Sequence, residues 1–399
     1  MPQYISPAIK TLDDALGAVT ELAPIARQCS QKAENARNLA PEVVDAIAAA
    51  GLWGVFTPAG VGGSGLIGLD EAFEVVRALA YADTSTAWSL FICATTPAIL
   101  AAKLPADGLA EVLADGIGPM SLVFGPNGRS RPTEGGLRVT GRWPFASGIG
   151  YAGWVMANTV LLDDDGAPKP GAGGPPELIS VVVPTEQVHI VDDWHVAGLR
   201  GTGSMSFTLD DVFVPARRSF SFFAPSRLDD AKYRLPLFSL LAPGFAGVAI
   251  GMAERALDEV RAVLPNRVGP PKFQPASEDP VIQRTVGRAQ AAIRGAREST
   301  RAVFDTYVDR RLRGVDLSEL SVVDRCELHQ QVVWAAETCR DAVGDLFRIA
   351  GASAIYETSP IQRIWRDSNV LTQHLYLRDT QHENAGKLAL GLDVVNPTI

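Results

Sequence analysis

The sequence predicts a mostly helical α+β protein in which a β-rich middle part separates two helical parts. Of its 399 residues 47% are hydrophobic and 20% are charged, which is typical of a globular protein and excludes disorder, collagen and coiled coil. At roughly 100 to 200 residues per domain, this length predicts two or three units. The helix signal is lost near residue 119 and returns near residue 235. We therefore predict an N-terminal helical domain (1–118), a middle β domain (119–225) and a C-terminal helical bundle domain (226–399).

The N-terminal domain contains clear helix boundaries. Pro41 suits the first position of a helix, because proline lacks the N–H that would be unpaired there, and Gly51 suits its end. We expect a second helix to begin near Leu69 and a third, largely buried, near Thr86.

The middle domain contains short β-branched or alternating segments bounded by Gly, Pro and Asp, which predicts an antiparallel sheet or barrel. Residues 163–177, rich in Gly, Pro and Asp, read as an exposed loop between two strands. The predicted strands are 136–143, 154–162, 178–184 and 206–214.

The C-terminal domain is predicted from helix caps. Asp279 followed by Pro280 is an N-cap with proline at the first helical position. Ser318 can cap the next helix, which Gly351 would end.

Two stretches, 84–102 and 235–253, each run 19 residues without a charge. That length is enough for a membrane span. Both are diluted by Ser, Thr, Gly and Pro, so we predict buried helices in a large bundle or at a subunit interface. The second stretch would be difficult for a monomer to cover, which favours an oligomer.

Charge and cysteine usage limit the possible partners. The net charge is −9 and there is no long basic block, so neither nucleic acid nor an anionic membrane is expected, and a small molecule is the predicted partner. The four cysteines form no CxxC motif and no cluster with histidine. We therefore expect reduced thiols in a cytoplasmic protein without a metal site.

Three segments carry motifs: GRWPFASGIGYAGW at 141–154, WHVAGLRGTGSMSFTLDDVFVP at 194–215, and 349–391, which includes GASAIY, the RD pair and QH. Together they resemble the acyl-CoA dehydrogenase superfamily, and more closely its two-component flavin-dependent (group D) monooxygenases, over essentially the whole chain. The resemblance implies an acyl-CoA dehydrogenase-like fold, with a middle antiparallel β-barrel or sheet and a C-terminal four-helix bundle.

The resemblance also implies a function. Such an oxygenase component binds reduced FMN or FAD supplied by a separate NAD(P)H flavin reductase, reacts with O2 through a C4a-hydroperoxyflavin, and hydroxylates a small aromatic substrate of the phenol or indole type. The absence of a GxGxxG motif between a strand and a helix fits an external source of reduced flavin. A homotetramer is implied by the family.

The resemblance places cofactor contacts on hydroxyl, aromatic and glycine-rich positions. A small hydroxyl followed by glycine lets donors approach a flat ring closely, although the alternative is a simple tight turn. For Arg200 the alternative to catalysis is a salt bridge that holds its loop to the bundle, and for Gly351 it is a helix C-cap. The predicted cofactor-binding residues are Phe124, Phe145, Ser147, Thr202, Ser204 and Ser353, the last as a phosphate contact at a neighbouring subunit's flavin.

The third segment distinguishes oxygenation from dehydrogenation. Aligning on Arg366 and Asp367 places Leu375 where dehydrogenases carry a catalytic glutamate, and 235–253 contains no Asp or Glu. His374 stands in the QH position of the monooxygenases. It is therefore the predicted catalytic residue, assisted by Ser147.

The substrate site is predicted from the same comparison. Thr95 and Thr96 stand where phenol hydroxylases often carry a second histidine, and with Leu375 they are the predicted substrate-binding residues. Without that histidine the substrate class stays open among a phenol activated otherwise, an indole, an amine and a thioether. His195 is expected to serve its loop, and His329 carries no predicted role. Two alternatives stay open: an acyl-CoA dehydrogenase or oxidase with an unusual base, and a non-catalytic ligand-binding member of the fold.

Overall fold

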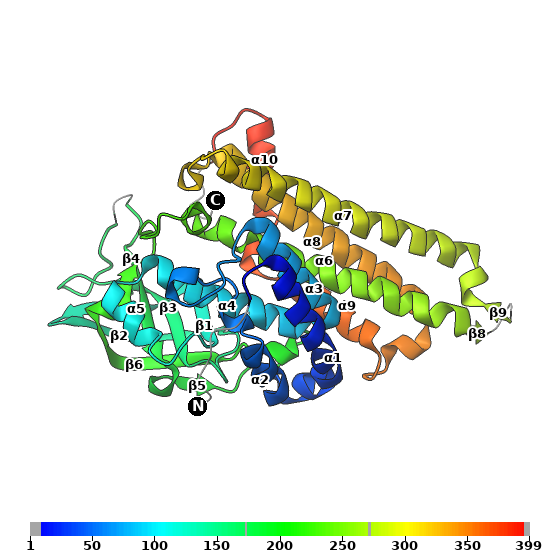
Figure 1. Ribbon diagram of the computed structural model, residues 1–399, viewed down its shortest axis with the longest axis horizontal. Helices are drawn as coiled ribbons and strands as arrows, with labels where there is room; N and C mark the ends of the chain where they lie inside the picture. Colours follow the sequence, from blue (N-terminus) through cyan, green and yellow to red (C-terminus); the bar gives the residue numbers. More distant parts are fainter. Residues whose placement is uncertain (1–8, 172–173, 270–272, 395–399) are drawn as a thin grey trace. The chain divides into compact units, whose positions relative to one another are not determined.

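The computed structural model describes residues 9–171, 174–269 and 273–394 (Figure 1). It confirms the predicted acyl-CoA dehydrogenase-like arrangement of helices, sheet and helices along the chain. Two compact units form. The sheet unit extends to Ile67 and includes Ser89–His195 and Arg200–Arg234; the bundle unit comprises Gly68–Trp88, Val196–Leu199 and the chain from Leu235 onward. The three-domain division remains a prediction.

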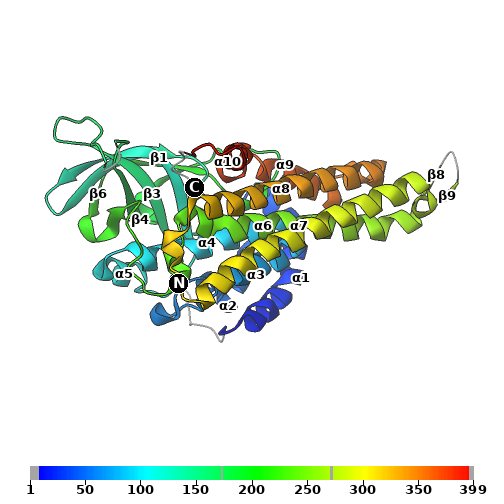
Figure 2. The ribbon, with the colours of Figure 1, turned by 90° about the horizontal axis from the view of Figure 1, so that it is seen from above.

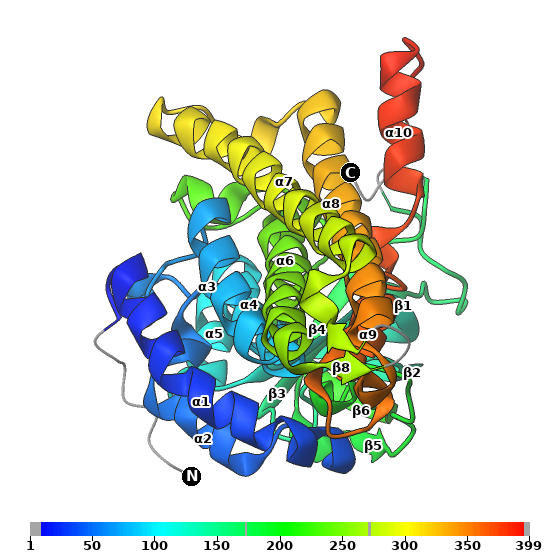
Figure 3. The same ribbon diagram turned by 90° about the vertical axis from the view of Figure 1, so that its right-hand side faces the viewer.

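The sheet unit begins with two helices that lie side by side (Figure 3). Thr11 caps the first through the N–H of Asp14, whose carboxylate accepts in return from the Thr11 N–H. Pro41 opens the second, as predicted. The helices of this unit are α1 (Leu12–Ala36), α2 (Pro41–Ala49), α5 (Ala106–Val112) and the part of α4 (Thr84–Lys103) from Ser89 onward.

The sheet has the strand order β5-β6-β2-β1-β3-β4-β7, and the four predicted strands correspond to β2, β3, β4 and β6. The β1–β3 pairing is parallel, unlike the antiparallel pairings of the other strands in this sheet. The chain reverses direction between β1 and β2 and again between β2 and β3, so β3 returns in the direction of β1. The strands are β1 (Met120–Thr133), β2 (Gly136–Trp143), β3 (Trp154–Leu161), β4 (Leu178–Pro184), β5 (His189–Val191), β6 (Ser206–Pro215) and β7 (Ser219–Ser221).

The bundle unit consists of long helices, of which α6, α7 and α8 run side by side (Figures 1 and 2). A two-stranded hairpin of β8 (Val268–Gly269) and β9 (Gln274–Pro275) joins α6 to α7. The helices are α3 (Leu69–Ala82), α6 (Leu237–Val263), α7 (Pro280–Leu312), α8 (Val322–Ala350), α9 (Pro360–Leu371) and α10 (Thr380–Ala389).

The predicted caps hold for α7 but not for α8. The Asp279 carboxylate accepts from the Val281 N–H at the start of α7. The expectation that Ser318 caps α8 is wrong, because Ser321 does so in a capping box with Asp324. The box satisfies two backbone N–H groups at the start of the helix, those of Ser321 and Asp324, whereas a lone serine satisfies one.

Helix α6 is covered by its own chain. Gly247 and Gly251 lie so close to α3 that a Cβ at Gly251 would be 2.2 Å from the Arg77 carbonyl oxygen. The apolar stretch 235–253 is therefore buried largely by α3 and α8, and the argument that it needs a second subunit is wrong. The most apolar windows of α4 and α6 are 94% and 83% buried, as expected for core helices of a soluble protein.

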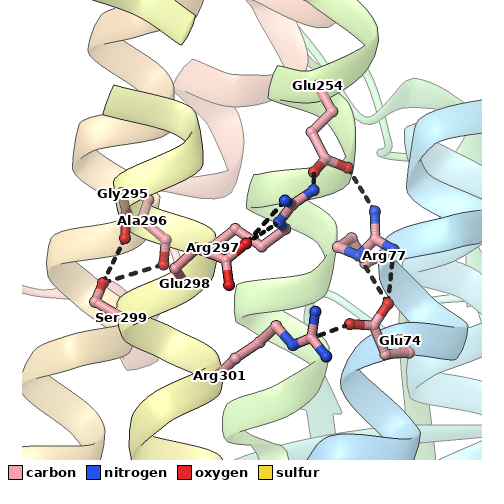
Figure 4. Close-up of polar contacts among 9 residues, drawn as sticks. All are labelled: Glu74, Arg77, Glu254, Gly295, Ala296, Arg297, Glu298, Ser299 and Arg301. Atoms are coloured by element: carbon pink, nitrogen blue, oxygen red, sulfur yellow. Dashed lines mark hydrogen bonds and ion pairs between the residues drawn. The ribbon is translucent and has the colours of Figure 1, made fainter. Parts of the chain in front are cut away.

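A network of charges ties α3, α6 and α7 together (Figure 4). Arg77 bonds to Glu74 and Glu254, each at 2.6 Å, and Glu254 also accepts from Arg297 at 3.0 Å. Burial opposes the charge of Arg77, but the two glutamates outweigh it and raise its pKa.

Candidate active site

In the sheet unit, three hydroxyl side chains meet. The Oγ atoms of Ser147 and Ser204 are 2.7 Å apart, and Ser204 Oγ is 2.7 Å from Thr202 Oγ1. All three residues are at most 4% exposed. We call them the hydroxyl trio. It joins the two glycine-rich segments that the sequence indicated.

The backbone of these two segments is also interlocked. The Gly148 N–H donates to the Thr202 carbonyl at 3.0 Å, and both Gly148 (φ +73°) and Gly203 (φ +55°) adopt the left-handed region. From α4, the Cys93 thiol approaches the Ser147 carbonyl oxygen at 3.7 Å. Ser147 is therefore held through both its side chain and its carbonyl.

The proton count of the trio bears on its chemistry. Two hydrogen bonds among three hydroxyls use two protons. When Thr202 donates to Ser204 and Ser204 donates to Ser147, the Ser147 proton is not used within the trio. The two contacts define the positions of the three oxygens, and either atom of each pair can be the donor.

An exposed aromatic ring lies next to the trio in the chain. Phe145 is 69% exposed, has a positive φ of 66°, and packs edge-on against Trp194 at 6.2 Å between ring centroids. A non-glycine residue held in this conformation at a functional position is a recognised form of local strain. An exposed ring beside a buried hydroxyl donor fits a flat cofactor with ring acceptors.

Phe124 lies in β1, at the point where the pairing with β3 shifts between Val123 and Gly128. The Phe124 carbonyl accepts from the Asn158 amide at 2.9 Å, and its ring packs on Phe222. Its role as a flavin contact stays a prediction.

In the bundle unit, His374 caps a short 3-10 helix, η11 (Leu375–Leu377). Its Nδ1 accepts from the Tyr376 backbone N–H at 3.1 Å. Because Nδ1 is an acceptor, the neutral ring carries its proton on Nε2. Within the described part of the chain Nε2 makes no hydrogen bond.

The rings of Trp88 and Phe245 pack against His374, which is otherwise exposed, and Tyr376 stacks on Phe245. We call these four residues the aromatic cluster. Ring centroids of Trp88 and Phe245 lie 5.5 and 4.7 Å from the imidazole. Part of His374 is exposed to solvent, but the protein atoms around its other sides desolvate the ring. This desolvation, helped by the charge of Arg378, lowers the pKa of His374 to about 4. The imidazole is therefore neutral near pH 7.

His329 joins this region, although the sequence indicated no role for it. It is fully buried on α8, and its ring centroid is 5.1 Å from that of Tyr376. Its Nε2 is 3.4 Å from Ser239 Oγ of α6. Burial lowers the pKa of His329 to about 4, so this ring is neutral as well. The one signal in the sequence was its place on the apolar face of α8.

Arg366 and Asp367, the RD pair of the third motif, hold the loop that precedes Arg200. The Asp367 carboxylate accepts from the Leu199 N–H at 2.6 Å, and Arg366 donates to the Ala197 carbonyl at 2.8 Å. Arg200 makes no ion pair with the residues that the structure describes, and its buried Nε has no partner among them. The salt bridge considered for Arg200 is thus not supported, and Arg366 with Asp367 holds the loop instead.

The predicted substrate-binding residues lie in two places. On α4, Thr95 and Thr96 are buried, and the Thr96 hydroxyl donates to the Ile92 carbonyl of its own helix. Leu375 follows His374 and is 53% exposed. Their contacts with substrate stay predictions.

Gly351, Ser353 and His195 are the remaining residues that the sequence singled out. Gly351 (φ +88°) ends α8, as its alternative reading proposed, and Arg267 donates to the Ile349 carbonyl there. Ser353 follows on the exposed surface of the 3-10 helix η10 (Ala352–Ile355), so its phosphate contact stays a prediction. His195 Nε2 lies 3.1 Å from Nη1 of Arg37, the C-cap residue of α1, which fits a role in holding its loop.

Family comparisons match both helical parts of the chain. Residues 17–102 match the N-terminal domain of acyl-CoA dehydrogenases and residues 243–379 match their C-terminal domain. A pigment production hydroxylase from a Rhodococcus species is 30% identical over 98% of this chain and 99% of its own. This chain belongs to the acyl-CoA dehydrogenase superfamily, in the branch of the two-component flavin-dependent monooxygenases.

Further relatives agree with this membership. The oxygenase component of an FADH2-dependent resorcinol hydroxylase from a Rhizobium species is 28% identical over 95% of this chain and 94% of its own. The structure of XiaF from a Streptomyces species, in complex with FADH2 and glycerol, has a TM-score of 0.88 at 26% identity, covering 97% of this chain and 98% of XiaF. The monooxygenase uses reduced flavin supplied by a separate reductase.

Proposed function

We propose that this monooxygenase hydroxylates a small phenol- or indole-type substrate, with His374 as a neutral hydrogen-bond donor, assisted by Ser147 at the flavin edge. The observation that carries the proposal is the bond from the Tyr376 N–H to His374 Nδ1. Because that nitrogen is occupied, the ring presents an N–H at Nε2 to a ligand. Its low pKa keeps this donor neutral at physiological pH.

The cofactor supplies the oxygen chemistry, because reduced flavin activates O2 when it is bound. We assign its ring to the exposed Phe145 and the buried hydroxyl trio, which the two glycine-rich segments bring together. Phe124 and Ser353 remain candidate contacts. The protein groups orient the ring and keep water from it.

The substrate class follows from the aromatic cluster. Trp88, Phe245 and Tyr376 are buried aromatic side chains that pack next to one polar donor, His374. We propose that this apolar aromatic environment suits a flat ring with a single hydroxyl or N–H. The relative that acts on resorcinol supports a phenol. Substrate contacts of Leu375 and, on α4, of Thr95 and Thr96 are part of the proposal.

We propose a homotetramer, which is the family expectation, and a cytoplasmic location. The separate reductase is expected to act transiently, and the burial of α4 and α6 is consistent with the proposed cytoplasmic location.

The test combines an assay with two matched variants of His374. Protein, flavin, a flavin reductase, NADH and O2 are mixed with phenols and indoles, and hydroxylated product and hydrogen peroxide are both measured. Asn at position 374 can keep the acceptor that Tyr376 N–H needs but loses the outward donor, whereas Gln can place a donor near Nε2 but loses the cap.

We expect His374→Asn to keep wild-type stability and to lose product at least about 100-fold, with peroxide rising. His374→Gln should be less stable by about 1 kcal/mol but should keep more product than the Asn variant. Equal product from the wild type and His374→Asn would contradict the donor role.

A further inference from the structure

Two of the buried polar atoms in the bundle unit that have no hydrogen-bond partner in the described chain belong to neighbouring rings. They are the Tyr376 hydroxyl and His329 Nδ1. Tyr376 is 3% exposed and His329 is 0% exposed. Their rings are neighbours, with centroids 5.1 Å apart and an angle of 48° between the ring planes.

One small polar group that bonds to both atoms would satisfy the Tyr376 hydroxyl and His329 Nδ1 together. Unpaired buried polar groups destabilise a protein, and buried water normally satisfies those that protein atoms do not reach. The two atoms have complementary hydrogen-bonding roles, one as a donor and the other as an acceptor. The phenol donates, a water molecule accepts that bond, and the same water donates to an imidazole nitrogen.

The contact between His329 and Ser239 is compatible with the tautomer in which Nδ1 accepts. The His329 Nε2 lies 3.4 Å from Ser239 Oγ, so an Nε2–H can donate to that hydroxyl. The neutral ring then carries no proton on Nδ1. Nδ1 is left as the acceptor that the water requires.

Tyr376 connects this pair to His374. Its backbone N–H donates to His374 Nδ1, and its ring stacks on Phe245 at 4.3 Å with 11° between the planes. Phe245 in turn lies 4.7 Å from the His374 ring. A group that fixes Tyr376 therefore fixes the orientation of His374.

We propose that one buried water molecule bridges the Tyr376 hydroxyl and His329 Nδ1, and that His329 is thereby a positioning residue for His374. The positioning role rests on the proposed function of His374, whereas the water site does not depend on it.

The first test is a double-mutant cycle of stability. Tyr376→Phe removes only the hydroxyl and keeps the ring stack and the backbone N–H; His329→Leu removes the acceptor. Each single variant should lower the folding equilibrium constant about 10-fold, because it leaves one buried group unpaired. The double variant should lose about the same 10-fold rather than about 100-fold, because both partners are then gone.

Losses that multiply to about 100-fold would overturn the shared water. If His329→Leu does not fold, a crystal structure of the wild-type protein decides the question. Electron density for a water within hydrogen-bond distance of both atoms supports the proposal, and a dry gap overturns it.

The positioning role is tested by the partition between product and peroxide. Tyr376→Phe should lower the product fraction of consumed NADH about 3-fold or more while leaving the apparent affinity for reduced flavin unchanged. The matched control is Tyr233→Phe, which removes a buried hydroxyl bonded to the Phe56 carbonyl in the sheet unit. It should cost stability without changing the partition.

An unchanged partition in Tyr376→Phe would overturn the positioning role. If the wild type makes no product from any substrate, the proposed function fails. The water site is still decided by the stability cycle and the crystal structure.

Discussion

The imidazole of His374 is bonded at Nδ1 to a backbone N–H two residues along the chain, and this single contact sets its tautomer. The sequence placed a histidine at this position through family resemblance. It could not show whether the ring donates or accepts. That depends on the backbone conformation of 374–376, which is a property of the folded turn.

The hydroxyl trio leads to a prediction at the same scale. Ser204→Ala removes the central hydroxyl and leaves Ser147 and Thr202 without a shared partner. We expect a loss of about 1 to 2 kcal/mol in the free energy of unfolding and weaker retention of reduced flavin. Urea denaturation and anaerobic flavin titration measure both.

The control for this variant is Ser221→Ala, an exposed position on β7, which should change stability by less than about 0.5 kcal/mol. Equal stability of Ser204→Ala and the wild type would show that the trio contributes nothing to the fold.

At the scale of elements, most helices and strands could be predicted because each carries a local signal. Pro41 and Asp279 mark helix starts, and the alternating strands gave β2 and β6 to within a residue or two. The parallel β1–β3 pairing could not be predicted, because it depends on which edge of β1 is free. The cap of α8 was misplaced because Ser318 and Ser321 satisfy the same simple rule, and only the capping box separates them.

The turn that holds Ser147 should not tolerate a side chain at Gly148. A Cβ there would lie 2.5 Å from Cys93 Sγ, and the residue has a positive φ. Gly148→Ala should therefore destabilise the protein by at least about 2 kcal/mol and reduce product.

Gly287→Ala is the matched control for this change. Gly287 lies inside α7 with open space around the position of a Cβ, so alanine should stabilise the protein by up to about 1 kcal/mol. Thermal or urea unfolding of both variants measures the predicted destabilisation by Gly148→Ala and the predicted stabilisation by Gly287→Ala. A harmless Gly148→Ala would contradict the close packing of this turn.

For the whole molecule, burial of His329 predicts how stability depends on pH. Its pKa falls from an ordinary 6.5 to about 4 in the folded protein. Between these values the unfolded chain binds a proton that the folded chain does not, so acid favours unfolding. The loss begins as the pH falls through about 6.5 and reaches about 3 kcal/mol near pH 4.

Urea unfolding at a series of pH values measures this loss. His329→Gln should make the decline between about pH 6.5 and about pH 4 shallower without abolishing it, because His374, whose pKa is also lowered to about 4, still titrates. The same slope in the wild type and the variant would show that His329 does not titrate as its burial requires.

The charged network makes a second prediction at this scale. Glu254→Gln leaves Arg77 and Arg297 without the carboxylate they share between α3 and α7. We expect a loss of about 1 to 3 kcal/mol in urea unfolding, because both guanidinium groups are partly buried. Glu298→Gln at the exposed end of the network should cost less than about 1 kcal/mol. Equal losses would contradict a central role for Glu254.

The candidate site shows where prediction from the sequence ends. Ser147 and Ser204 could be identified because their glycine-rich motifs are local. His329 and Tyr376 are 47 positions apart and become neighbours only when α8 and the turn after α9 pack together. No periodicity or motif in the sequence carries that information.

The central claim is that this chain inserts an atom of molecular oxygen into an aromatic substrate. The most direct measurement supplies ¹⁸O2 to the protein with flavin, a flavin reductase, NADH and a phenol or indole, and follows the product by mass spectrometry. We predict one ¹⁸O atom in the hydroxylated product and loss of that product in His374→Asn. A product whose oxygen comes from water, or hydrogen peroxide as the sole outcome across the substrate panel, would contradict the claim.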